Sequence, residues 1–98
     1  MLFMNASEIY DAVRRYGDNP DYPVLSAAVR TLSNLAEWTD NNSDGWHSWP
    51  NPCRAARQLQ ELIQKRAEPT VAEYRKALTP IKRLATKHNI PSTVFVFI

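Results

Sequence analysis

Residues 70–88 read TVAEYRKALTPIKRLATKH, and this stretch decides the fold. Thr70 and Glu73 match a capping box, in which the threonine hydroxyl accepts a hydrogen bond from the N–H of Glu73 and the glutamate accepts one from the N–H of Thr70. A helix is therefore predicted to begin here. Its apolar positions recur at alternating steps of three and four, as on one side of a helix: Val71, Tyr74, Leu78, Ile81, Ala85 and His88.

The other side of this predicted helix carries positive charge, with no acid after Glu73. Its cations are Arg75, Lys76, Lys82, Arg83 and Lys87. We expect the apolar side to enter a core and the basic side to be exposed. Pro80 lacks a backbone donor and clashes with the carbonyl four residues back. The helix is therefore expected either to kink there or to end at Leu78 and restart with Thr79 as the N-cap.

The length and composition indicate one domain, residues 1–98, with one modest core. The hydrophobic content of 44% is typical of a folded globule. No apolar run approaches the roughly 18 residues of a membrane span, and the apolar residues 1–4 are too short for the core of a signal peptide. The single cysteine, Cys53, excludes an intramolecular disulfide and agrees with a reducing compartment. A cytoplasmic protein without membrane contact is expected.

The two parts of the chain differ in charge. Residues 1–45 carry seven acids against three bases, whereas residues 46–98 carry three acids against nine bases. This asymmetry indicates internal complementarity, a head-to-tail contact between copies, or an anionic partner for the second part.

Three more helices are predicted before residue 70. Asn5 and Glu8 form a second capping box, so the first helix is expected from about Ala6 to Tyr16, with Gly17 as its C-terminal stop. The second helix is marked by Leu25, Ala28, Val29, Leu32, Leu35 and Ala36.

The second helix is expected to end near Trp38 or Thr39. The third is expected to open with Asn51 as N-cap and Pro52 at the first helical position, and to end at Glu68-Pro69.

The C-terminal residues 92–98, STVFVFI, are β-prone and carry no charged side chain. They are expected to lie in a groove between helices, to pair with residues 2–4 as a small antiparallel strand, or to be covered by another chain. The predicted fold is mainly α, a small four- to five-helix bundle with an apolar extended C-terminal tail.

A loop predicted over residues 40–51 contains the best candidates for a binding surface, which are Trp46, His47 and Trp49. Tryptophan supplies a large contact area and dominates the energetics of many interfaces. The alternative is that both indoles fold back over the small core, because aromatic side chains are often buried.

The same loop matches the first half of a calcium-binding EF-hand, with Asp40, Asn42 and Asp44 at alternate positions before Gly45. The twelfth position, which should be a bidentate glutamate, is Asn51. Calcium would therefore lose its strongest ligand, and the pattern favours a helix end followed by turns.

Catalytic and metal chemistry have little support in the sequence. Cys53 near a helix N-terminus would have a lowered thiol pKa, and His47 or His88 could act as its base. No orienting third group or oxyanion loop accompanies them, and one cysteine with two histidines falls short of four zinc ligands. We therefore expect no enzymatic activity, no metal and no cofactor.

The basic side of the 70–88 helix could instead follow nucleic-acid phosphates, extended by four further cations: Arg54, Arg57, Lys65 and Arg66. An ordinary solvated face is the simpler interpretation. A helix-turn-helix reading of residues 81–98 fails, because the recognition helix would be the apolar tail, which has no side chain that reads bases.

Residues 44–56, DGWHSWPNPCRAA, resemble sequence from the small accessory proteins of lambdoid temperate phages. The chain is similar in size to the phage inhibitors that bind the host RecBCD helicase-nuclease, and like them it lacks a recognisable set of catalytic residues. The resemblance covers that loop and the start of the third helix. It implies a protein that modifies a host enzyme by docking on it in the host cytoplasm, and it identifies no individual functional residue.

These observations predict a non-enzymatic protein-binding module that inhibits or redirects a larger host nucleic-acid-processing enzyme. Trp46 and Trp49 are the expected anchors, with His47 beside them, and the basic side of the 70–88 helix would steer the protein toward an acidic surface. The alternative is direct nucleic-acid binding through that basic side. The oligomeric state is left open.

Overall fold

The computed structural model describes residues 4–42 and 54–98. These ranges form four α-helices and one short 3-10 helix: α1 (Ala6–Tyr16), α2 (Pro23–Asn42), α4 (Arg57–Gln64), α5 (Val71–His88) and η2 (Ser92–Val94). No strand occurs in the described part of the chain, so the predicted mainly α fold is confirmed. Every helix in these two ranges is too short or too polar to cross a membrane.

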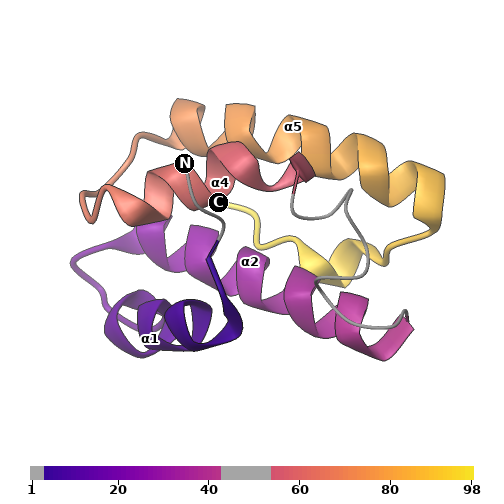
Figure 1. Ribbon diagram of the computed structural model, residues 1–98. Helices are drawn as coiled ribbons and strands as arrows, with labels where there is room; N and C mark the ends of the chain where they lie inside the picture. The colour runs from indigo at the N-terminus through magenta and orange to yellow at the C-terminus, as the bar shows by residue number, and fades with distance from the viewer. Residues whose placement is uncertain (1–3, 43–53) are drawn as a thin grey trace.

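Helix α2 is the centre of the bundle, because it packs against α1, α4, α5 and η2. Leu25, Ala28 and Leu35 of α2 have no accessible surface. Each fully buried leucine contributes about 1.5–3 kcal/mol relative to an exposed one. Figure 1 shows α2 running beneath α4 and α5, with α1 packed at its N-terminal end. The other elements are therefore positioned mainly by their contacts with this helix.

Both predicted capping boxes are formed. The Asn5 side chain accepts from the Glu8 N–H at 2.9 Å, and the Thr70 hydroxyl accepts from the Glu73 N–H at 3.1 Å. The reciprocal bond from the Thr70 N–H, and then the Thr70 side chain, hold the pKa of the Glu73 carboxyl below its ordinary value. The two predicted helix starts, Ala6 and Val71, are confirmed.

Helix α2 is capped by a residue that is distant in the sequence. The Glu68 carboxylate accepts hydrogen bonds from the N–H groups of Val24 at 2.9 Å and Leu25 at 2.8 Å. Pro23 occupies the first helical position, where no N–H is needed. The connection between α4 and α5 is thereby tied to the start of α2, and the negative charge lies at the positive end of the helix dipole.

The predicted end of the second helix near Trp38 or Thr39 is wrong, because α2 continues to Asn42. Thr39 is fully buried, and its hydroxyl donates to the Leu35 carbonyl at 2.8 Å, so its side chain supports another helical turn. Asp40 and Asn42 are consequently helical, whereas the EF-hand pattern requires them in a loop. The rest of that pattern lies outside the described residues.

The predicted third helix is interrupted at Ala56. Residues 54–55 are helical, the backbone of Ala56 at φ −87° and ψ 6° leaves the helical conformation, and helix α4 begins at Arg57. It ends at Gln64, and Arg66 adopts a left-handed conformation with φ 55°, so the predicted end at Glu68-Pro69 is wrong. The predicted cap at Asn51-Pro52 lies outside the described residues.

Helix α5 passes through Pro80 as one helix, so the predicted restart is not formed. The Thr79 hydroxyl donates to the Arg75 carbonyl at 3.3 Å and does not cap a new helix. The predicted stop at Asn89 is confirmed, because this residue is left-handed with φ 58°. The Ile90 N–H donates to the Ala85 carbonyl at 3.0 Å, as in a Schellman motif.

The core side of α5 is wider than the predicted seam. It includes Ala77 and Leu84 in addition to the expected Tyr74, Leu78, Ile81 and Ala85, while Val71 and His88 are half-buried.

The C-terminal tail, residues 92–98, lies in the groove between α2 and α5, which was one of the three predicted positions (Figure 1). It begins with the turn of η2, where the Val94 carbonyl accepts from the Asn34 side chain at 3.2 Å. Val94 and Phe95 are buried and Val96 is half-buried. Most of the apolar surface of the tail is therefore covered by this chain.

A closed hydrogen-bonded ring fixes the tail in its groove. The Val96 N–H donates to Thr31 Oγ1 at 3.0 Å, and Tyr74 Oη donates to the Val96 carbonyl at 2.6 Å. Thr31 Oγ1 and Tyr74 Oη lie 2.8 Å apart, and since the tyrosine proton is directed at Val96, the threonine hydroxyl completes the ring as donor. We name these three residues the Thr31–Tyr74–Val96 ring.

Replacement of Tyr74 by phenylalanine is expected to lower the free energy of unfolding by about 1–3 kcal/mol at neutral pH, because Thr31 and Val96 lose a buried partner. Burial raises the pKa of the Tyr74 hydroxyl above its ordinary value, against the smaller opposing effect of the Thr31 hydrogen bond. The stability that depends on the neutral tyrosine is thus present below about pH 10 and is lost as the pH rises further.

Urea unfolding of wild type and Tyr74→Phe at pH 7 and above pH 10 measures both effects. The stability difference between the two proteins should shrink at the alkaline pH. A Tyr74→Phe protein as stable as wild type at pH 7 would show that the ring does not stabilise the fold.

Replacement of Glu68 by alanine is expected to cost about 1–2 kcal/mol, because the first turn of α2 loses its cap. Glu68→Gln keeps one acceptor oxygen and should cost less. Glu61, which lies on α4 and pairs with Arg57, provides the control: Glu61→Ala should change the stability by less than about 0.5 kcal/mol. Equal losses for Glu68→Ala and Glu61→Ala in urea unfolding would contradict the capping role.

Candidate functional site

The five predicted partner-binding cations lie on the side of α5 opposite its core side. All are exposed: Arg75, Lys76, Lys82, Arg83 and Lys87. We name this surface the basic face of α5. It forms because the two helical turns on either side of Pro80 keep one register, so the cations after the proline remain aligned with those before it.

No cation of the basic face forms an ion pair with an acid among the described residues. The ion pairs there, Asp11 with Arg14 at 3.8 Å and Arg57 with Glu61 at 3.3 Å, each lie within one helix. Neither pair involves α5. The internal complementarity considered from the charge asymmetry is therefore not formed by ion pairs to this face, and its charge remains available to a partner.

One edge of the basic face contacts the end of the C-terminal tail. Lys82 Nζ lies 5.2 Å from the centre of the Phe97 ring, which is within the range of a cation–π interaction. Arg75 donates to the main-chain oxygen of Ile98 at 3.3 Å. Each of the last two apolar residues is thus contacted by one cation of the basic face.

Phe97 and Ile98 are exposed, unlike the earlier residues of the tail. Phe97 is 65% exposed and Ile98 is 52% exposed, whereas Phe95 is 9% exposed. The rings of Phe95 and Phe97 lie 6.2 Å apart, so the exposed ring rests on the buried one. The exposed Phe97 side chain therefore lies beside Lys82 and packs on Phe95, which belongs to the core.

The other edge of the basic face borders α4 and residues 54–55, which precede it. Arg54, Arg83 and Lys87 line a hollow of about 420 Å³ together with Ala55, Pro80 and Leu84. We name it the cationic hollow, because all of its charged side chains are positive. Arginine and lysine over an apolar floor suit a group that is both acidic and apolar.

A neighbouring hollow on the same α4–α5 border, of about 300 Å³, includes Lys65 and Lys76 but also Glu61 and Glu73, so its charges balance. Positive charge is therefore concentrated at the end of α5 that lies near Arg54, and Lys76 belongs to a more neutral part of the surface.

The other predicted site residues, Trp46, His47 and Trp49, lie outside the described residues, as does Cys53. His88 is half-buried in the last turn of α5. Within residues 4–42 and 54–98, no group of three His, Cys, Asp or Glu side chains is placed to hold a metal ion.

Two parts of this surface were missed from the sequence. Phe97 was predicted only as part of an apolar tail. Its spacing of two from Phe95 places both rings on the same side of an extended segment, so the sequence pattern does not mark Phe97 as the exposed one. The cationic hollow is lined by Arg54 and by residues of α5. These residues are far apart in the sequence, so helical periodicity could not predict that they lie together.

Comparison of the chain with protein-family models, with curated proteins and with solved structures finds no match. The function is therefore inferred from the geometry of this surface.

Substitution of the two phenylalanines of the tail distinguishes a residue that stabilises the core from one that is exposed at the surface. Phe95→Ala is expected to lower the free energy of unfolding by about 3–5 kcal/mol, because a buried aromatic side chain is removed. Phe97→Ala should change it by less than about 1 kcal/mol, since only one cation–π contact and partial burial are lost. Thermal or urea unfolding of both variants measures the difference, and a similar loss for each would place Phe97 in the core.

Proposed function

We propose that this chain is a non-enzymatic protein-binding module that docks on an acidic and partly apolar surface of a larger protein. The observation that carries the proposal is the exposed Phe97 side chain, held beside Lys82 on the basic face by a tail that is itself fixed in the core. Aromatic side chains that become fully desolvated on binding contribute much of the binding energy at protein interfaces. Surrounding cations increase association rates and select acidic partners.

The order of the last residues supports this use of the surface. The Thr31–Tyr74–Val96 ring is completed at Val96, so Phe97 and Ile98 add little to the fold, and yet both contact the basic face through Lys82 and Arg75. An anchor that is ordered before binding loses less conformational entropy when the partner arrives. The proposed interface consists of Phe97 and Ile98 at its apolar centre and the basic face around them.

The resemblance of residues 44–56 to phage accessory proteins suggests the class of the partner. We propose a host nucleic-acid-processing enzyme, such as a helicase-nuclease, in the host cytoplasm, with inhibition or redirection of that enzyme as the outcome. Such enzymes bind a phosphate backbone with cationic surfaces, so the acidic surface required here would lie elsewhere on the enzyme. Trp46, His47 and Trp49 stay predicted as additional contacts.

Direct nucleic-acid binding is the second candidate. The aligned cations of α5 could follow phosphates, and an exposed aromatic such as Phe97 can stack on an unpaired base. The two candidates differ in salt dependence, because phosphate contacts release counterions and weaken steeply with salt. Apolar docking around Phe97 should weaken less.

The test is affinity capture from nuclease-treated host lysate, followed by direct binding of the purified partner at two salt concentrations. Phe97→Ala is expected to weaken binding at least tenfold, as hot-spot truncations do. Tyr10→Ala is the matched control, because Tyr10 is also exposed, at 67%, but lies on α1 away from the basic face. It should leave the affinity unchanged.

The charges are tested with Arg83→Gln combined with Lys87→Gln, against a control that removes two exposed cations of α1, Arg14→Gln with Arg15→Gln. The first pair should slow association and reduce its salt dependence, and the second should not. A Trp46→Ala, Trp49→Ala double variant tests the predicted loop contacts in the same assay. Recovery of nucleic acid alone, abolished by salt and indifferent to Phe97→Ala, would replace protein docking with the second candidate.

A further inference from the structure

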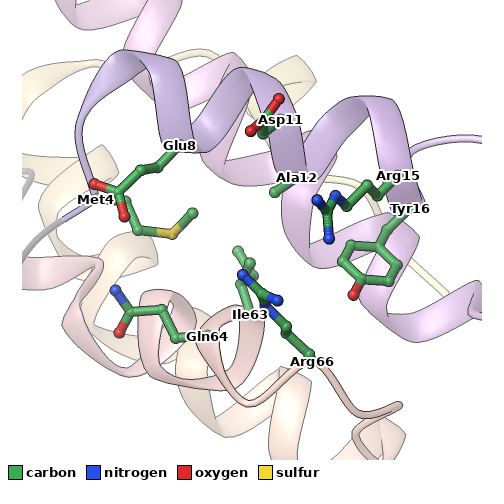
Figure 2. A pocket seen from close by; sticks show the side chains of 9 residues that line it. All are labelled: Met4, Glu8, Asp11, Ala12, Arg15, Tyr16, Ile63, Gln64 and Arg66. Carbon is green, nitrogen blue, oxygen red and sulfur yellow. The ribbon is translucent and has the colours of Figure 1, made fainter.

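A third hollow lies on another side of the bundle, between α1 and the C-terminal end of α4 (Figure 2). Its volume is about 160 Å³. Its floor is apolar, because Met4, Ala12 and Ile63 are 5%, 8% and 3% exposed and belong to the main core. This volume is close to the roughly 150 Å³ of a protein cavity that accommodates benzene. The hollow therefore has room for a ligand the size of a single aromatic ring.

Two carboxylates line this hollow, and both already have partners. Glu8 accepts the hydrogen bond from the Asn5 N–H at 3.1 Å as part of the first capping box. Asp11 lies 3.8 Å from the guanidinium of Arg14 on the same helix. Their negative charge is therefore partly satisfied within α1.

The two arginines of the hollow have no carboxylate within ion-pair distance among the described residues. Arg15 reaches in from α1 and Arg66 from the end of α4, and Figure 2 shows both guanidinium groups directed into the space between the two helices. The Tyr16 side chain lies beside them at the rim. Two planar donor groups thus approach one small space from opposite walls, where they can bind both oxygens of a carboxylate.

The position of Arg66 depends on an unusual backbone conformation. Its φ of 55° is left-handed, which is uncommon for a residue other than glycine, and it reverses the chain after α4. Strained residues of this kind concentrate at ligand-binding and switch sites. Here the conformation brings the Arg66 side chain back over Ile63 and the hollow (Figure 2).

We propose that this hollow binds a small organic monocarboxylate with an apolar body of about the size of a benzene ring. The carboxylate is held by Arg15 and Arg66, and the apolar body lies against Met4, Ala12 and Ile63. We name this the α1–α4 acid site. It is independent of the proposed protein-docking surface, since none of its residues belongs to the basic face of α5.

The experiment is titration of ¹⁵N-labelled protein with benzoate, followed by the backbone amide chemical shifts. Saturable shifts confined to α1 and residues 63–66 are expected, with a dissociation constant in about the millimolar range for so small a ligand. Benzyl alcohol, which keeps the ring but has no charge, should bind at least about tenfold more weakly. Inorganic phosphate, which has charge but no apolar body, should not cause saturable chemical-shift changes of the same amides.

Arg15→Gln and Arg66→Gly should each weaken benzoate binding about tenfold or more. Arg66→Gly removes the guanidinium at a position whose backbone favours glycine, so this variant should fold at least as well as wild type. Arg75→Gln on α5 makes the same change of charge outside the hollow and should bind benzoate as wild type does. The proposal is overturned if benzoate gives no saturable shifts, if the Arg15 and Arg66 variants bind it as well as wild type, or if benzyl alcohol or phosphate competes equally.

Discussion

The hydrogen bond between the Tyr74 hydroxyl and the Val96 carbonyl is the contact on which the position of the C-terminal tail, and with it the proposed docking surface, depends. It joins α5 to the end of the chain, and through Thr31 it joins both to α2. The ring satisfies the N–H and the carbonyl of Val96 where no neighbouring strand is present to pair with them. A β-prone tail is thereby held inside a helical bundle, and its buried side chains complete the groove between α2 and α5.

The same ring connects stability with the proposed function. Thr31 and Tyr74 are buried and contribute to the fold, whereas Phe97, the residue that follows Val96, is exposed. Because the backbone is hydrogen-bonded on both sides at Val96, the Phe97 ring that follows it lies against Lys82. The packing of the tail in the core therefore determines the position of Phe97, the proposed anchor, and the basic face supplies the positive charge around it.

Local signals predicted the parts of the fold that depend on neighbours in sequence. The boxes at Asn5 and Thr70 and the left-handed stop at Asn89 were found because each uses side chains within a few residues. The cap of α2 by Glu68 was missed, since its donors are 43 and 44 residues away. The cations of α5 were found from helical periodicity, but the hollows at its border and in the α1–α4 acid site depend on which helices meet. No pattern along the chain contains that information.

Native-state amide hydrogen exchange at Val96 tests the account most directly. If its N–H is bonded to the buried Thr31 hydroxyl, it should exchange orders of magnitude more slowly than an unfolded chain, while the amide of Ile98 exchanges rapidly. Protection at Val96 should fall in Thr31→Val, which keeps the volume of the side chain and removes the acceptor. Exchange of the Val96 amide at the unprotected rate in wild type would show that the tail is not held in the groove, and Phe97 would then be no fixed anchor.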